Sequence, residues 1–220
     1  MAKFEKATVG EKVAGYVEMR MTMLVSVLVV LVVAIAAFAL VTGISSKNSM
    51  KGISALDLIS YEMTADSSGL SEAEIAERKQ KALSSIEEYC KKGGVVGVRA
   101  NMLSAEISYS DKEFSKAAAS WVAAFSKGKK SYTAPIAAFN AASCYENLDD
   151  FSNAEKYYAE AAKASDFLLA GRANFNLGRM REKLGNIDGA LEAYNAVIDK
   201  EPDSSWGKLA KTQTIKLGLK

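Results

Sequence analysis

The side chains of this chain that could carry out acid–base chemistry are few and scattered. The sequence has no histidine, so general acid–base catalysis would depend on Asp, Glu, Lys, Tyr or Cys. The acidic residues occur in adjacent pairs such as Glu87-Glu88 and Asp149-Asp150, a pattern typical of solvated helix surfaces and helix caps. We therefore predict that the protein is not an enzyme and has no catalytic residues.

The sequence also argues against metal, cofactor and nucleic-acid sites. Without histidine, the two cysteines Cys90 and Cys144 cannot complete a His/Cys metal site. The segment Gly93-Gly94-x-x-Gly97 lies between expected helices with no preceding strand, so it indicates a turn and not a phosphate-binding loop. The net charge of +2 is unlike that of a nucleic-acid binder. We favour two free thiols over a disulfide, because two helices should separate the cysteines.

The longest apolar segment runs from Met23 to Val41. These nineteen residues include no charge, and thirteen of them are Val, Leu, Ile or Phe. A helix needs roughly 20 apolar residues to cross the hydrocarbon core of a bilayer, which is about 30 Å thick. We therefore predict a transmembrane helix over residues 21–44, which would tether the chain to a membrane.

An apolar run of this kind has two alternatives to a transmembrane helix. A cleaved signal peptide is one, since Ala37-Phe38-Ala39 resembles a cleavage site. However, twenty residues precede the run, and it is longer than the apolar region of about 7–15 residues that signal peptides have. A buried helix of a soluble protein is the other, but a soluble helix of this length normally carries a polar face.

Basic residues indicate the orientation of this helix. Four precede the apolar run and two follow it closely: Lys3, Lys6, Lys12 and Arg20, then Lys47 and Lys51. Positive charge near the ends of a transmembrane helix favours the cytoplasmic side. We therefore predict that residues 1–20 form a cytoplasmic segment and that the chain beyond the helix faces the periplasm or an equivalent exterior.

An internal repeat organises the rest of the chain. Three segments share an apolar residue, an alanine three positions later and an aromatic residue four positions after that: Phe114, Ala117 and Trp121; Phe151, Ala154 and Tyr158; Ile187, Ala190 and Tyr194. The alanines lie 37 and 36 residues apart, close to the ~34-residue period of a helix-turn-helix repeat. Small residues at this position let two helices approach closely, and the aromatic residue fills the space beside them.

These residues resemble the tetratricopeptide repeat (TPR), and the third copy also has Leu177, Gly178 and Pro202 at matching positions. The resemblance implies an all-α fold, with a single N-terminal transmembrane helix followed by a TPR-like α-solenoid of about three to four helix pairs. A C-terminal helix would cap the last repeat. The expected boundaries are a linker at 45–53, a solenoid at 54–220, repeats at 54–92, 98–130, 135–168 and 171–204, and a capping helix at 206–219.

Two local motifs predict where helices of this solenoid begin. Ser71-x-x-Glu74 and Ser110-x-x-Glu113 have the spacing of a capping box, in which each side chain pairs with the other residue's backbone N–H. The first is expected to open a helix that stops near Lys91. The second is expected to open the second helix of the next repeat.

In TPR folds the first helices of the repeats line a concave groove, and the resemblance places specific residues there. The set is Arg99, Met102, Glu106 and Tyr109 from one repeat, Phe139, Ser143, Glu146 and Asn147 from the next, and Arg172, Phe175, Arg179, Glu182 and Lys183 from the last. Asn140 joins the candidate set because it matches, with Arg172, a position of the carboxylate-clamp subtype of TPR. Such a groove could hold an extended or helical peptide, with arginine binding its carboxylates. Phe139 and Phe175 could equally pack between helices, and both alternatives stay open.

The whole layout resembles the ancillary SecYEG translocon subunit family of bacteria. This resemblance implies a single-pass protein of the bacterial inner membrane, with a cytoplasmic N-terminus and periplasmic repeats that contact the Sec translocon and exported chains. The function predicted is a membrane-anchored TPR adaptor that binds proteins or peptides and is accessory to protein translocation or periplasmic chaperoning. The alternatives are a structural scaffold of a cell-envelope or division assembly, and a cytosol-facing membrane-tethered scaffold.

Overall fold

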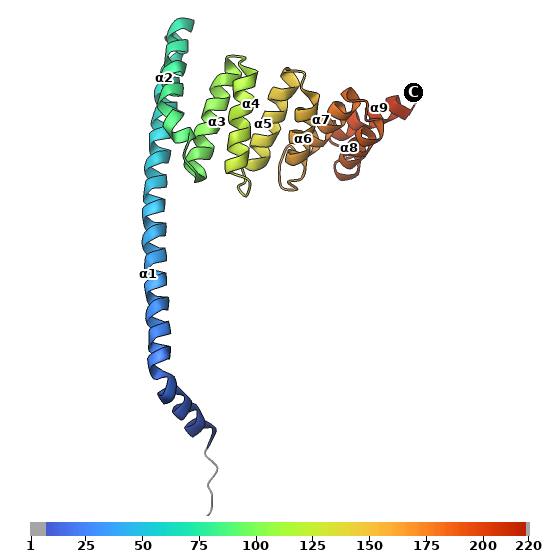
Figure 1. Cartoon of the computed structure of the whole chain (residues 1–220). Coiled ribbons are helices and arrows are strands. Elements are labelled where there is room, and N and C mark those ends of the chain that lie inside the picture. Colours follow the sequence, from blue (N-terminus) through green and yellow to red (C-terminus); the bar gives the residue numbers. More distant parts are fainter. Residues whose placement is uncertain (1–7, 219–220) are drawn as a thin grey trace, which may run out of the picture. The chain divides into compact units, whose positions relative to one another are not determined.

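The structure is a computed structural model that describes residues 8–218, and all regular secondary structure in that range is helical (Figure 1). The elements are α1 (Val9–Thr64), the short 3₁₀ helix η1 (Ser67–Gly69), α2 (Glu72–Cys90), α3 (Gly94–Ser110), α4 (Phe114–Lys127), α5 (Ala134–Asn147), α6 (Phe151–Ala162), α7 (Ala170–Lys183), α8 (Ile187–Lys200) and α9 (Ser205–Gly218). The predicted fold class is confirmed: an all-α chain with one long apolar N-terminal helix and TPR-like helical repeats. Two compact units meet between Met50 and Lys51.

Helix α1 contains the apolar run. Thr8 caps its N-terminus: the Thr8 N–H donates to Glu11 Oε2 at 2.7 Å, and the Glu11 N–H donates to Thr8 Oγ1 at 3.3 Å. By length and composition α1 could cross a membrane, and none of its most apolar stretch is buried. Lys3 and Lys6, which enter the predicted orientation, and Leu219, the last residue of the predicted capping helix, lie outside the described residues.

The predicted linker over residues 45–53 is helical and belongs to α1. Its polar residues 45–49 suggested an irregular segment, but the stretch contains no proline. Every residue therefore keeps the backbone N–H that a helix needs, and the hydrogen bonds of α1 continue through it. The solenoid boundary at residue 54 stays a prediction.

Three helix pairs share one kind of internal turn. The helices α3 and α4, α5 and α6, and α7 and α8 are each joined by three residues. The middle residue of each turn has a positive φ: Lys112 at 59°, Asp149 at 56° and Gly185 at 76°. The N–H of the following residue donates to the carbonyl five positions earlier, at 2.9 Å (Glu113 to Ser108), 3.0 Å (Asp150 to Tyr145) and 2.8 Å (Asn186 to Arg181). This left-handed C-terminal cap stops the first helix of each pair at the same point.

The capping predictions have different outcomes. The box at Ser71 and Glu74 is confirmed, with both reciprocal hydrogen bonds present. The box predicted at Ser110 is wrong, because Ser110 is the last residue of α3 and its hydroxyl donates to the Ile107 carbonyl at 2.7 Å. The turn occupies residues 111–113, so α4 begins at Phe114, and Glu113 at its N-cap makes no side-chain cap hydrogen bond.

Small residues allow the helices of each pair to approach closely. Ala117, Ala154 and Ala190 are fully buried. In the last pair, a Cβ added to Gly178 of α7 would lie only 2.5 Å from Cε1 of Tyr194 on α8. The Tyr194 ring therefore occupies the space that glycine leaves open, as the repeat pattern predicts.

From α2 onward the helices pack in chain order, each against the next, and α9 packs against both α8 and α7. At the N-terminal end of the second unit, Leu56 near the end of α1 is buried with Ile86 of α2 and with Val96 and Ala100 of α3. At the other end, Phe175 and Tyr194 pack with Ala210 and Leu217 of α9. The exact boundaries of the repeats, 54–92, 98–130, 135–168 and 171–204, stay predictions.

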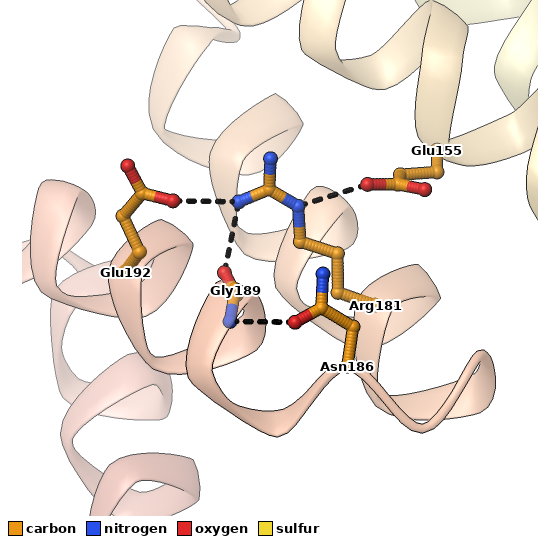
Figure 2. Close-up of polar contacts among 5 residues, drawn as sticks. All are labelled: Glu155, Arg181, Asn186, Gly189 and Glu192. Carbon is orange, nitrogen blue, oxygen red and sulfur yellow. Dashed lines mark hydrogen bonds and ion pairs between the residues drawn. The ribbon is translucent and has the colours of Figure 1, made fainter.

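Arg181 on α7 joins two neighbouring helix pairs (Figure 2). Its Nε donates to Glu155 Oε1 on α6 at 3.0 Å, and its Nη1 donates to the Gly189 carbonyl at 2.9 Å and to Glu192 Oε2 at 3.1 Å. The Gly189 N–H in turn donates at 3.0 Å to Asn186 Oδ1, the side chain that caps α8. The Arg181 side chain is only 21% exposed, so these charged hydrogen bonds are partly shielded from water.

Replacing Lys112 with glycine should stabilise the protein. A residue other than glycine in the left-handed region costs roughly 1–2 kcal/mol. Glycine removes this strain, but its greater conformational freedom in the unfolded chain offsets part of the stabilisation. We expect Lys112→Gly to raise the free energy of unfolding by about 0.5–1 kcal/mol. Urea unfolding of the full chain in a neutral detergent, followed by helical circular dichroism, measures this.

The matched control for this variant is Asp149→Gly at the equivalent turn. Aspartate tolerates the left-handed region better than lysine does, so its replacement should change the unfolding midpoint less. An Lys112→Gly variant that is no more stable than the parent would contradict the strain assigned to this turn.

Candidate protein-binding site

Helices α5, α7 and α9 border a cleft of about 520 Å³. It is lined by Ser143, Glu146 and Asn147 of α5, Tyr158 of α6, Arg172, Phe175, Asn176 and Arg179 of α7, and Trp206 of α9. We call it the α5–α7–α9 cleft. It lies between the first helices of two successive pairs, because every first helix in a stack of helix pairs faces the same side.

The structure brings part of the predicted groove together and separates the rest. Arg172, Phe175 and Arg179 line the cleft, with three of the residues predicted from the preceding repeat. Phe139 and Asn140 instead line a larger groove described below. The residues predicted from the first repeat do not line the cleft.

Arg99, Met102 and Glu106 lie on α3, outside the α5–α7–α9 cleft. Nη2 of Arg99 forms an ion pair with Asp57 Oδ1 at 2.6 Å. Met102 is partly buried against the main hydrophobic core. Desolvation raises the pKa of the Glu106 carboxyl above its ordinary value. The three residues therefore share a helix with one another but not a binding site with Arg172.

The cleft also contains residues that sequence reasoning missed as site residues. Tyr158 was assigned to the core from its spacing, and 1% of its surface is exposed, but it also borders the cleft. Trp206 was expected only to begin the capping helix. The signal that could have found it is the expected packing of that helix on the last repeat, which brings its first turn to the end of the groove.

A polar network occupies the middle of the cleft. Glu146 accepts a hydrogen bond from Arg179 Nη2 at 2.6 Å and another from the Tyr158 hydroxyl at 2.9 Å. Arg179 Nη1 also donates to Asn176 Oδ1 at 3.2 Å. Burial, and next the Glu146 charge, raise the pKa of Tyr158, so its hydroxyl stays protonated as a donor. Arg179 is thus held by groups of the protein itself.

Arg172 differs from Arg179 in having no carboxylate partner among the described residues. Its guanidinium lies over two aromatic rings, 5.3 Å from the centroid of Phe139 and 5.6 Å from that of Trp206. The side chain is exposed on α7. Ring contacts of this kind use no N–H group as a hydrogen-bond donor to a carboxylate, so the guanidinium can still bind one through two parallel hydrogen bonds.

Phe139 and Phe175 belong to the core. They expose 6% and 7% of their surface, so neither ring offers an exposed face to a ligand in the groove. Phe139 packs edge-on against Tyr158 with the ring centroids 5.4 Å apart. Phe175 packs against Tyr194 and Trp206, also with centroids 5.4 Å apart. Of the two alternatives left open by the sequence, packing between helices describes their environment.

Within residues 8–218, no group of three or more His, Cys, Asp or Glu side chains is placed to hold a metal ion. Cys90 and Cys144 are free thiols. Burial raises the pKa of Cys144 to about 12, so its thiol is protonated at neutral pH and weakly reactive.

Comparisons with known proteins agree with this architecture. Residues 139–205 match the family model described as tetratricopeptide repeat. A "TPR repeat-containing protein" of Treponema pallidum (strain Nichols) is 36% identical over 115 residues, which make up 52% of this chain and 48% of that protein. The chain therefore spans about half the length of this curated relative. The segment matched to the family model includes every residue of the α5–α7–α9 cleft except Trp206.

Alanine at Phe175 should destabilise the fold rather than only remove a binding contact. Because the ring is almost fully buried, we expect Phe175→Ala to lower the free energy of unfolding by about 3–5 kcal/mol. The matched change Arg172→Ala, which removes exposed contacts with aromatic rings, should cost less than about 1 kcal/mol. Urea unfolding of the full chain in detergent compares the two. Equal costs would contradict the assignment of Phe175 to the core.

Proposed function

We propose that the protein is a membrane-anchored adaptor that binds other proteins through the α5–α7–α9 cleft, and that it assists protein translocation or chaperoning at a bacterial inner membrane. The observation that carries this proposal is the cleft itself. Most of its lining belongs to the segment that matches the tetratricopeptide repeat family model, and it contains the guanidinium of Arg172, which has no carboxylate partner in the described range.

The chemistry of the cleft favours a peptide with a carboxylate. Arg172 would bind this carboxylate, supplied by an acidic side chain or by a chain terminus. The hydroxyl and amide groups of Ser143 and Asn147 would pair with the peptide backbone. The ring of Trp206 offers an apolar face at the end of the cleft. A volume of about 520 Å³ suits a few residues of an extended chain.

The exposed apolar stretch of α1 supports membrane anchoring. In water this surface would be an aggregation site, whereas in a bilayer each apolar residue contributes favourably to insertion. The basic residues before the stretch support an N-terminus in the cytoplasm and repeats in the periplasm. The layout of an apolar anchor followed by repeats resembles that of the ancillary SecYEG translocon subunits, and this resemblance supports a role in translocation or chaperoning.

Protease accessibility tests the orientation. In intact cells whose outer membrane has been opened, added protease should digest residues 51–220 while a cytoplasmic control protein stays intact. Protection of these residues until the inner membrane is dissolved would contradict a periplasmic domain. It would leave a cytosol-facing, membrane-tethered scaffold as the function.

Site-directed photo-crosslinking tests the partner. A photoreactive phenylalanine analogue in place of Asn147, an exposed residue of the cleft, should crosslink to exported chains or translocon subunits in cells. Arg172→Glu should abolish these crosslinks because it reverses the charge that binds the carboxylate. Lys208→Glu, an equal charge reversal on α9 outside the lining of the cleft, should preserve them.

Two results would contradict the proposal. Crosslinks from residue 147 only to division or cell-wall proteins would favour the scaffold function. Translocon crosslinks that persist in the Arg172→Glu variant would show that the cleft is not the binding site.

A further inference from the structure

The solenoid has a second and larger concavity at one edge. A groove of about 1320 Å³ is lined by α4, α5 and α6 and by the two loops that connect α4 to α5 and α6 to α7. These loops cover residues 128–133 and 163–169, and both lie at the lower edge of the solenoid as drawn in Figure 1. We call this the loop-edge groove. It is formed mainly by side chains outside the α5–α7–α9 cleft.

The loops that border this groove are longer than the turns within the three helix pairs. They have six and seven residues, whereas the turns within the helix pairs have three. The first loop is held in shape by its own hydrogen bonds, including the Ser131 N–H to the Gly128 carbonyl at 2.8 Å and the Ser131 hydroxyl to the same carbonyl at 2.7 Å. Binding residues are disproportionately found on loops that a rigid scaffold positions.

Large apolar side chains are exposed at the rim of the groove. Tyr132 exposes 84% of its surface and Leu168 exposes 97%, although a loop of this kind could be built from polar residues. Below them, Phe125, Ile136 and Phe167 are only partly buried and line the groove. Apolar rim and floor together offer a place for a large side chain that the chain itself does not fill.

The charged side chains around the groove are mainly cationic. The lining includes four lysines and two acids: Lys129, Lys130, Lys156 and Lys163, with Glu160 and Asp166. Lys163 pairs with Glu160, and the Lys156 ammonium lies 5.1 Å from the centroid of the Tyr157 ring. Within the described part of the chain, Lys129 and Lys130 have no carboxylate partner. The groove is therefore complementary in charge to an acidic ligand.

We propose that the loop-edge groove is a second docking site, which binds an acidic segment of a partner protein. An aromatic or large aliphatic side chain of that segment enters the groove between Tyr132 and Leu168. Its carboxylates pair with Lys129 and Lys130. The concave shape favours a protein segment over a bilayer, because an extended side chain can enter a concavity of about 1320 Å³ and a broad membrane surface cannot.

The test uses the full chain in its own membrane, with a photoreactive phenylalanine analogue in place of Tyr132. The crosslinked partner is identified, and the crosslinked segment is mapped by mass spectrometry. We expect a segment of net negative charge with an aromatic or large aliphatic residue. Lys129→Glu with Lys130→Glu should reduce the crosslink yield by about tenfold, because two attractive contacts become repulsive. Raised ionic strength should reduce it as well.

Control variants separate this site from the cleft. Lys208→Glu with Lys216→Glu, the same change of charge on α9, should leave the yield unchanged. Equal helical circular dichroism in all variants shows that each is folded. A protein crosslink from residue 132 but none from residue 147 would overturn the proposed function and support docking in the loop-edge groove. A protein crosslink from residue 147 but none from residue 132 would overturn only this inference.

Four results would overturn the inference. They are no crosslink from residue 132, crosslinks to lipid, crosslinks to a second copy of this chain, and crosslinks to neutral or basic segments whose yield is the same in the Lys129→Glu and Lys130→Glu double variant.

Discussion

The close approach of two helices across a small residue is the interaction on which the solenoid depends. Where Gly178 of α7 meets Tyr194 of α8, no room remains for a Cβ. Adding even one methylene to a packed core typically costs about 1–3 kcal/mol, so the small residue fixes the spacing of the pair. That spacing sets how far each first helix lies from the next, and hence the width of the cleft between α5 and α7.

The sequence predicts the helix pairs well because the pattern that encodes them is local. An alanine and an aromatic residue four positions later define the second helix of each pair. The left-handed residues Lys112, Asp149 and Gly185 lie 37 and 36 residues apart, which is the spacing of those alanines. Local motifs mislead where the turn prevails. Ser110 has the sequence of an N-cap, yet the turn after α3 requires residues 111–113 and leaves Ser110 inside the helix.

The candidate site is less predictable because it depends on side chains that meet only after folding. Arg99 was assigned to the groove by its position in the repeat, but Asp57 from the end of α1 binds its guanidinium. Trp206 enters the cleft because α9 packs on α7. Arg172 and Arg179 have equivalent chemistry in the sequence, and only the structure distinguishes the arginine held by Glu146 from the one that is not. The burial of the two phenylalanines likewise follows from rings on other helices.

The arginine network at position 181 has a consequence for cooperativity. In a stack of repeats, stability is approximately the sum of the intrinsic stability of each repeat and the coupling between neighbours. Arg181 contributes to both the intrinsic stability and the coupling, since its guanidinium binds α8 of its own pair and α6 of the preceding pair. Fraying of α8 therefore withdraws partners from a cation that also holds α6. The last two repeats should open as one block, so the walls of the cleft are present or lost together.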